Sequence, residues 1–189
     1  MTDQLKALQK QCAACKTCPL CLTRQNTVFG MGNPAAPLLI VGEAPREQED
    51  RQGLPFVGPA GKLLDDFLTV IDLTREDCYI TNIVKCRPPK NRDPLPAEQD
   101  ACLPFLRQQV RLMRPQLILC LGRVAAQALI DPDFRVTRDH GTLINKKGTL
   151  MMGTFHPSAL LRNPRQRADA LEDFVYLRET LHHLKYKSE

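Results

Sequence analysis

Residues 38–61 constrain the fold more than any other stretch of the chain. The apolar run 38–41 is typical of a buried strand, and it stops at Gly42. A loop rich in acids, prolines and glycines follows, and helical periodicity begins after Gly61. α/β proteins build ligand sites from a strand, a glycine-bearing loop and a helix in this order. Because the loop matches neither a P-loop nor a GxGxxG turn, it does not indicate a nucleotide cofactor.

Strand and helix patterns alternate along the rest of the chain. Strands are expected at residues 78–86 and 116–121, and a β-hairpin at 142–145 and 149–155, turning at residues 146–148. Helices are expected near the N-terminus and over about 61–71, from 96 onward, over 122–130 and over 166–185. This order predicts a three-layer α/β/α sandwich around a central, mostly parallel four-stranded sheet. We expect one domain over residues 1–189, with a cysteine-rich arm at 1–28.

The bulk composition is that of an ordinary globular protein with a slight positive charge. The net charge of +5 favours a polyanionic partner only weakly. The sequence has no apolar run of about 18 residues and no signal peptide, so we expect no membrane contact and a cytoplasmic location.

The eight cysteines are unevenly distributed. Cys12, Cys15, Cys18 and Cys21 are separated by two residues each, a spacing that points to metal or redox chemistry in a reducing compartment. Zinc and an iron–sulfur cluster are both candidates. The ligands are either this run alone or Cys15 and Cys18 together with Cys86 and Cys102. Cys78 and Cys120 lie in predicted strands, where we expect them to be buried as small apolar side chains.

Three ordered motifs resemble those of the family 4 uracil-DNA glycosylases. The first runs from Gly42-Glu43-Ala44-Pro45 through Glu49-Asp50 to the segment 53–58, the second covers 81–89, and the third begins at His156-Pro157-Ser158. The resemblance extends from about Cys15 to the last helix. It implies a DNA repair glycosylase that flips uracil out of DNA and hydrolyses its N-glycosidic bond. The expected partner is uracil-containing DNA, single- or double-stranded, and the expected state is a monomer.

The resemblance also implies an iron–sulfur cofactor. Family members hold a structural 4Fe–4S cluster with four cysteines, and the matching positions here are Cys15, Cys18, Cys86 and Cys102. Cys12 and Cys21 remain alternative ligands, because C-x2-C pairs also occur at 12/15 and 18/21.

Specific residues acquire roles from the same resemblance. Phe56 is expected to stack on the flipped base, and the amide of Asn82 to pair with O4 and N3–H of uracil. His156 is expected to donate a hydrogen bond to O2 as negative charge develops there. Glu49 is expected to position the water, and Glu43 to act through the pocket wall. Glu47 and Asp50 are expected to be solvated acids.

Other positions are expected to meet the base or the DNA backbone. Ala44 and Arg46 join the substrate-binding residues, although Arg46 stands where family members usually have glycine. Arg46 could contact phosphate, narrow the pocket or alter the preferred base. Backbone N–H groups around Gly58 are candidates for a phosphate contact. Residues of the third motif are candidates for a wedge that enters the duplex, with a buried leucine pair as the alternative: Leu160, Leu161 and Arg162.

Three rival functions remain at this point. The first is a superfamily relative that acts on another deaminated base or bonds covalently to the abasic sugar through His140. The second is a non-catalytic DNA-binding module, against which Glu43, Asn82 and His156 argue. The third is an electron-transfer protein. No lysine stands in the motifs as an amine nucleophile, so we expect a monofunctional enzyme.

Overall fold

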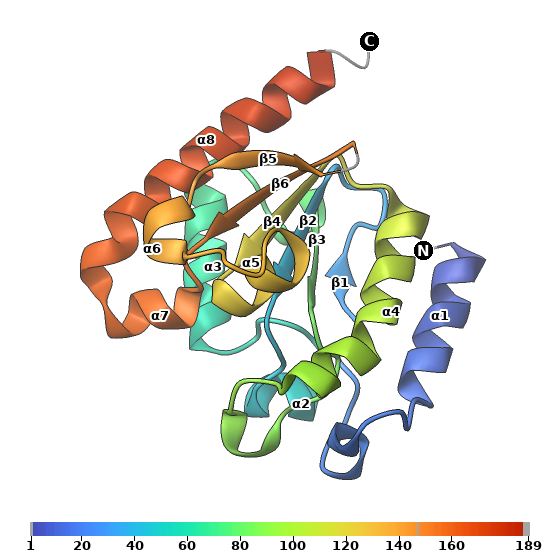
Figure 1. Ribbon diagram of the computed structural model, residues 1–189. Helices are drawn as coiled ribbons and strands as arrows, with labels where there is room; N and C mark the ends of the chain where they lie inside the picture. Colours follow the sequence, from blue (N-terminus) through green and yellow to red (C-terminus); the bar gives the residue numbers. More distant parts are fainter. Residues whose placement is uncertain (1, 147, 187–189) are drawn as a thin grey trace.

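A six-stranded sheet forms the centre of the molecule in the computed structural model, which describes residues 2–146 and 148–186 (Figure 1). The strand order is β1-β3-β2-β4-β6-β5. The strands are β1 (Met31–Gly32), β2 (Leu38–Gly42), β3 (Cys78–Asn82), β4 (Leu117–Leu121), β5 (Leu143–Lys146) and β6 (Thr149–Thr154). The sheet was expected to have four strands, mostly parallel, and it has six among the described residues. β3, β2, β4 and β6 run parallel, and antiparallel β1 and β5 extend the sheet at its two edges.

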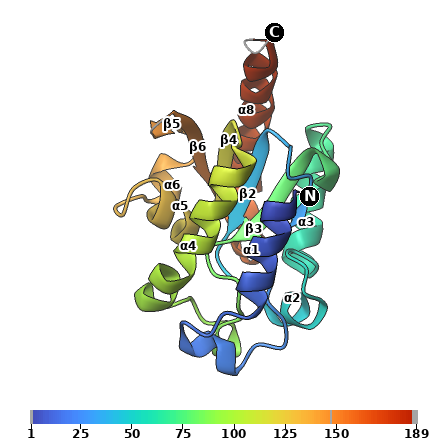
Figure 2. The same ribbon diagram turned by 90° about the vertical axis from the view of Figure 1, so that its right-hand side faces the viewer.

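Helices cover both faces of the sheet, which confirms the α/β/α prediction (Figure 2). The helices are α1 (Asp3–Ala13), α2 (Glu47–Gln52), α3 (Pro59–Val70), α4 (Pro96–Met113), α5 (Arg123–Leu129), α6 (Val136–Asp139), α7 (Pro157–Arg162) and α8 (Arg167–Tyr186). Single 3-10 turns occur at Pro19–Leu22, Arg75–Asp77, Pro89–Asn91 and Pro164–Gln166. None of the helices in the described part of the chain is long and apolar enough to cross a membrane.

The core has two main layers because successive strand residues point to opposite faces of the sheet. Leu38 and Ile40 of β2 pack with Phe67 of α3 and Phe174 of α8, whose rings stack with centroids 5.0 Å apart. Leu39 and Val41 face the other way and share a cluster with residues of α4 and α5. A third, smaller cluster joins α1 to α4. The apolar run 38–41 is therefore buried on both faces, as its composition predicted.

Three features of the chain differ from the sequence expectation. β3 ends at Asn82 rather than at residue 86, and the loop after β2 contains α2. β1 forms at Met31–Gly32, where the sequence pattern indicated no strand. The hairpin of β5 and β6 is present, and Lys147 of its turn lies outside the described residues.

Candidate active site

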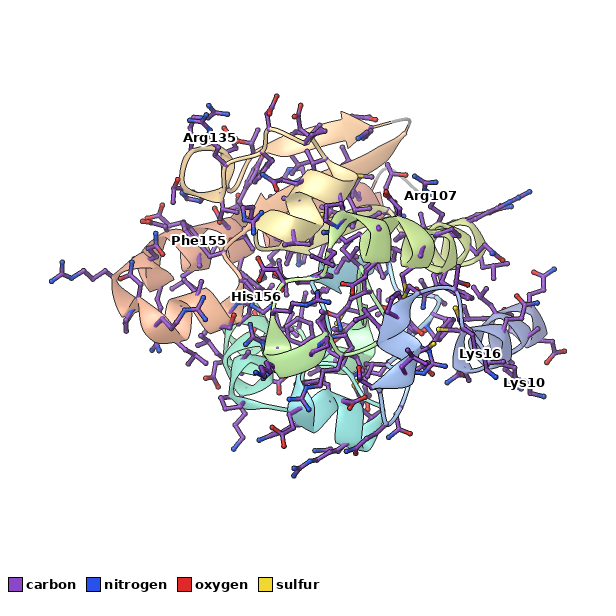
Figure 3. All side chains as sticks on the ribbon, turned by 60° about the horizontal axis from the view of Figure 1, so that its bottom comes forward. Lys10, Lys16, Arg107, Arg135, Phe155 and His156 are labelled. Atoms are coloured by element: carbon purple, nitrogen blue, oxygen red, sulfur yellow. The ribbon has the colours of Figure 1, made fainter. Side chains whose placement is uncertain are left out.

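A small cavity at the carboxyl ends of the strands brings together six of the predicted site residues. Its volume is about 20 Å³. It is lined by Ala44, Arg46, Glu49, Phe56, Ala60, Asn82 and His156. His156 lies toward the middle of the view in which this end of the molecule is turned forward (Figure 3). The sequence grouped these residues by resemblance alone, and the fold brings them to one place.

Gly42 allows the base-reading residues to meet over the end of β2. It pairs with Asn82 across the sheet, and a Cβ atom at this position would lie 2.4 Å from Asn82 Oδ1 and 2.6 Å from Phe56 Cζ. Any larger residue would therefore displace both side chains. Phe56 itself has a positive φ of 54°, an uncommon conformation for a bulky residue. The guanidinium of Arg75 donates to the carbonyl of Phe56 and helps to hold it there.

His156 follows β6 directly and adopts one tautomer. Its Nδ1 accepts from the backbone N–H of Ser158 at 3.1 Å and lies 2.8 Å from the Ser158 hydroxyl. An Nδ1 that accepts an N–H carries no proton, so the neutral ring bears its proton on Nε2. Burial, together with the positive charges of Arg46 and Arg162, lowers the pKa of His156 to about 4. The ring is thus neutral near pH 7 with an Nε2–H group to donate.

Glu43 faces a second cavity of about 330 Å³ that shares Arg46 and His156 with the first. Burial and the negative charge of Asp93 raise the pKa of Glu43 to about 7, against the opposing effect of Arg46 and Arg123. Asp93 is in turn paired with Arg123 at 2.8 Å. A carboxyl group with a pKa near neutrality beside a neutral histidine is suited to acid–base chemistry.

Glu49 is occupied by backbone donors. Its Oε1 accepts from the N–H groups of Val57 and Gly58, each at 3.0 Å, and its Oε2 accepts from the Arg46 N–H at 3.2 Å. These bonds favour a role in holding the loop over one in positioning water. They also correct the expectation for Gly58, because its N–H already has a partner and is not free for a phosphate.

Asp50 was expected to be a solvated acid, and this is wrong. The residue is 1% exposed, and its Oδ1 accepts from the backbone N–H groups of Gln25 and Asn26 at 2.9 and 3.2 Å. It therefore anchors the N-terminal arm to α2. Glu47 is exposed and pairs with Arg51, as expected for a surface acid.

The two leucines of α7 have opposite environments. Leu160 is 1% exposed and belongs to the core, whereas Leu161 is 40% exposed. Leu160 is therefore not a wedge, because it is buried. Adjacent positions of a helix point in different directions, so Leu161 is exposed although its neighbour is not. Leu161 and Arg162 line an open groove of about 520 Å³ together with Arg46, Arg51 and Gly58.

The proposed cysteine ligands approach one another between the arm and α4. Cys18, Cys86 and Cys102 share one cluster with Leu20. Burial raises the pKa of the Cys18 and Cys102 thiols, and Cys15 is near enough to raise both further. Within residues 2–146 and 148–186, no group of three or more His, Cys, Asp or Glu side chains is arranged to hold a metal ion. The donor set nevertheless has the chemistry of a thiolate cluster site.

The remaining cysteines divide as expected between core and arm. Cys78 and Cys120 are both fully buried in strands, which confirms their prediction as apolar core residues. Cys12 is 1% exposed and close enough to Cys15, Cys86 and Cys102 for their charges to raise its pKa, after the larger effect of burial. Cys12 thus stays an alternative ligand beside Cys15, Cys86 and Cys102.

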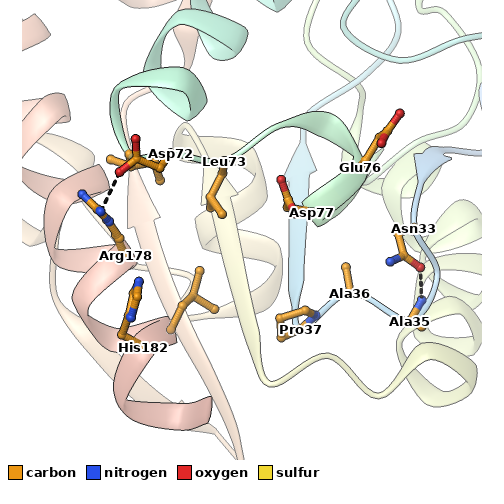
Figure 4. Close-up of a pocket in the computed structure, with 12 residues that line it drawn as sticks. Asn33, Ala35, Ala36, Pro37, Asp72, Leu73, Glu76, Asp77, Arg178 and His182 are labelled. Carbon is orange, nitrogen blue, oxygen red and sulfur yellow. Dashed lines mark hydrogen bonds and ion pairs between the residues drawn. The ribbon is translucent and has the colours of Figure 1, made fainter. Parts of the chain in front are cut away.

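Two other sites do not take part in this arrangement. His140 Nδ1 lies 2.9 Å from Asp173 Oδ1, and its ring packs on Phe155 with centroids 4.8 Å apart. It lines none of the cavities around His156 that the described residues form. A separate cavity of about 290 Å³ lies at the amino ends of β2 and β3, where Asp72 pairs with Arg178 at 2.6 Å (Figure 4). It contains no predicted site residue.

Sequence reasoning missed the residues that orient the site. Ser158 fixes the tautomer of His156. Asp93 helps to raise the pKa of Glu43. Arg24 donates to Cys86 Sγ at 3.1 Å and to the carbonyls of Ala13 and Cys15. The only signal for Ser158 was its place in the third motif. Asp93 and Arg24 make contacts distant in sequence, and no local pattern indicates such contacts.

Comparison with known proteins agrees with this geometry. A family model described as the uracil DNA glycosylase superfamily matches residues 29–185. The chain is 42% identical over 185 residues to a type-4 uracil-DNA glycosylase of Archaeoglobus fulgidus, covering 94% of this chain and 93% of that one. It is 44% identical over 163 residues to a type-4 uracil-DNA glycosylase of Thermotoga maritima, covering 85% of each. On these grounds the chain belongs to the uracil DNA glycosylase superfamily and, within it, to the type-4 uracil-DNA glycosylases.

Proposed function

We propose that this protein is a DNA repair glycosylase that flips uracil out of DNA and hydrolyses its N-glycosidic bond, leaving an abasic site. The relatives named type-4 uracil-DNA glycosylases support the reaction class. The cavity that joins Phe56, Asn82 and His156 supports the assignment of roles to this chain's residues.

The hydrogen bond from the Ser158 N–H to His156 Nδ1 carries the proposal. Cleavage of the glycosidic bond leaves negative charge on N1 and O2 of uracil. A neutral imidazole with its proton on Nε2 can donate to O2 as that charge grows, and it gives up no proton in the ground state. A donor held in place beforehand, in a site with little water, stabilises such charge efficiently.

Asn82 and Phe56 select and hold the base. Asn82 is 2% exposed, and its amide offers one donor and one acceptor, which match O4 and N3–H of uracil. Cytosine presents the reverse pattern and leaves both groups unpaired, which is costly in a buried site. The Phe56 ring, stacked at 28° on His156 with centroids 5.8 Å apart, provides an apolar face for the base.

Glu43 is our candidate for the group that faces the sugar and the attacking water. Its carboxyl shares a cavity with His156, whereas the oxygens of Glu49 already accept three backbone N–H groups. Once ionised, Glu43 would stabilise an oxocarbenium-like sugar and accept the proton of the water. Glu49 would act by fixing the loop 56–58 around the base.

Base release without strand cleavage follows from the side chains available. No lysine is present among the described residues that line the two cavities at His156 or the groove beside them. Strand cleavage by a glycosylase needs an amine nucleophile at the sugar, so hydrolysis is the expected reaction. We expect activity on single-stranded and duplex DNA by the monomer.

We further propose a structural 4Fe–4S cluster held by Cys15, Cys18, Cys86 and Cys102. The support is the approach of the four thiols and their chemistry as donors. When bound, the cluster would fix the arm against the loop that leads to α4. Arg24 and Asp50 tie the same arm by direct hydrogen bonds, independently of any metal.

Base release from labelled oligonucleotides tests the function. The substrates carry one uracil, opposite G, opposite A or in single-stranded DNA, with a thymine control. Release of free uracil and formation of an alkali-labile site, both slowed by ~10²–10³-fold in a His156→Ala variant that still binds the DNA, would support the proposal. Absence of release from anaerobically purified, brown wild-type protein would refute it.

A further inference from the structure

The base cavity as it stands cannot hold a base. Its volume of about 20 Å³ is room for about one water molecule, and a pyrimidine ring is several times larger. If the proposed function is correct, on which this inference rests, at least one lining group must move before uracil enters.

Most lining groups are fixed by contacts on several sides. Glu49 accepts three backbone N–H groups, and His156 is held through Nδ1 by Ser158. Phe56 is 5% exposed, with its carbonyl bound by Arg75 and its ring against His156. Asn82 is 2% exposed at the end of a central strand. Moving any of these groups would break contacts that shape the site.

The two alanines that complete the lining have no side chain to withdraw. Only Arg46 then remains as a long side chain without such restraint. Its guanidinium makes no hydrogen bond or ion pair with any residue that the structure describes, although its backbone N–H is held by Glu49.

Arg46 is also the only residue that lines all three cavities around the site, as far as the described residues show. The guanidinium is near enough to Glu43 and His156 to lower the pKa of each, after the larger effect of burial. The groove next to the base cavity has a volume of about 520 Å³ and is also lined by Arg51 and Arg162. It therefore offers room for the side chain. Arg162 adds positive charge there, whereas Arg51 is paired with Glu47, which lines the same groove.

We propose that Arg46 is a gate that occupies the base cavity in the free enzyme and is drawn into the groove by a DNA backbone phosphate. A guanidinium binds phosphate through paired N–H groups, so it gains a partner there that it lacks in the cavity. Arg51 and Arg162 line the same groove and add to the attraction for a phosphate, which helps to recruit DNA there. The cavity would thus open when DNA is bound and remain closed otherwise.

The gate makes free uracil a poor ligand. A ligand that binds only the open state loses affinity in proportion to the closed fraction. Free uracil carries no phosphate and cannot move Arg46, whereas the DNA substrate can. Release of the DNA product would close the cavity again and discourage rebinding of the excised base.

Arg46→Ala is the direct test, because it empties the cavity of the gate. Arg46 is the N-cap residue of α2 without a side-chain capping bond, so the change should leave folding intact. Calorimetric titration should show that Arg46→Ala binds free uracil ~10-fold more tightly than the wild type does. This factor is expected if the wild-type cavity is closed ~90% of the time. The KM for uracil-containing DNA should rise in the same variant, with a smaller dependence on salt.

Two further variants separate filling from charge. Arg46→Met still fills the cavity but cannot bind phosphate, so uracil binding should stay weak while the KM rises. Arg51→Ala removes a charge from the groove but not from the base cavity, so the KM should rise and uracil binding should not change.

Equal uracil affinity in the wild type and in Arg46→Ala would overturn the gate, as would a KM that does not rise. The titration requires no turnover, so it is independent of the proposed activity. Uracil release from DNA by both proteins with unchanged uracil binding would reject the gate and leave the glycosylase assignment in place. Absence of release by both proteins would reject the glycosylase assignment itself.

Discussion

The backbone N–H of Ser158 donates to Nδ1 of His156 at 3.1 Å and so leaves the imidazole proton on Nε2, in a ring that lines the base cavity. His156→Ala removes this donor. We expect kcat to fall by ~10²–10³-fold, the usual effect of losing one donor to a developing oxyanion. Single-turnover kinetics together with DNA-binding titrations would measure it, and the binding of uracil-DNA should change little.

Ser158→Ala is the matched control for this prediction. It deletes the hydroxyl 2.8 Å from Nδ1 but keeps the backbone N–H that sets the tautomer. The rate should therefore stay within a few-fold of the wild type. A loss in Ser158→Ala as large as in His156→Ala would mean that the hydroxyl, and not the backbone, orients the ring.

The second prediction concerns pH. Burial and Asp93 raise the pKa of Glu43 to about 7, and the ionised form is the one that stabilises the sugar cation. The single-turnover rate should therefore rise as pH increases through about 7. His156 does not cause this change, because its pKa of about 4 keeps it neutral over the same range.

Substitutions on either side of Glu43 should move this profile in opposite directions. Asp93→Asn removes a negative charge, lowers the pKa of Glu43 and shifts the rise in rate to lower pH. Arg123→Met removes a positive charge and shifts the rise to higher pH. Identical pH profiles in both variants and the wild type would show that another group controls the rate.

The third prediction separates the two leucines of α7. Leu161→Ala should reduce activity on duplex DNA more than on single-stranded DNA, because an exposed apolar side chain can fill the position of a flipped base only in a duplex. Its thermal stability should stay close to that of the wild type. Comparing rates on matched single-stranded and duplex substrates would detect the effect.

Leu160→Ala should show the reverse pattern. Leu160 is 1% exposed, and truncating such a side chain typically costs about 2–5 kcal/mol of unfolding free energy. Chemical denaturation should reveal this loss, and the ratio of duplex to single-stranded activity should be unaffected. A selective loss of duplex activity in Leu160→Ala would contradict the assignment of the wedge to its neighbour.

The central fold was predictable because strand burial is a local signal. The run 38–41 is apolar at every position, so it indicates a strand covered on both faces, and the helical patterns between strands indicate parallel connections. By contrast, α2 has the sequence EQEDRQ, which shows no apolar periodicity. Its fold depends on contacts such as Asp50 with the N-H groups of Gln25 and Asn26, which no local pattern records.

The residues of the site were predictable from the sequence, but the roles of its two carboxyl groups were not. Phe56, Asn82 and His156 were identified through their motifs, and the fold brings them to one cavity. The division of roles between Glu43 and Glu49 depends on which carboxyl is occupied by backbone donors. That in turn depends on how the loop 56–58 folds over α2, which requires the three-dimensional structure.

The last prediction concerns the cysteines. Serine at position 15, 18, 86 or 102 should abolish the brown colour and the bound iron, because each change removes a proposed thiolate ligand. The arm should then loosen, and hydrogen exchange should increase around Thr17 and Thr23. Cys21→Ser is the matched control, because Cys21 neighbours Cys18 but is not a proposed ligand, and it should keep both colour and iron.

Cys12→Ser tests the alternative ligand, because Cys12 lies near Cys15, Cys86 and Cys102. Retention of iron in Cys15→Ser together with its loss in Cys12→Ser would replace Cys15 by Cys12 in the ligand set.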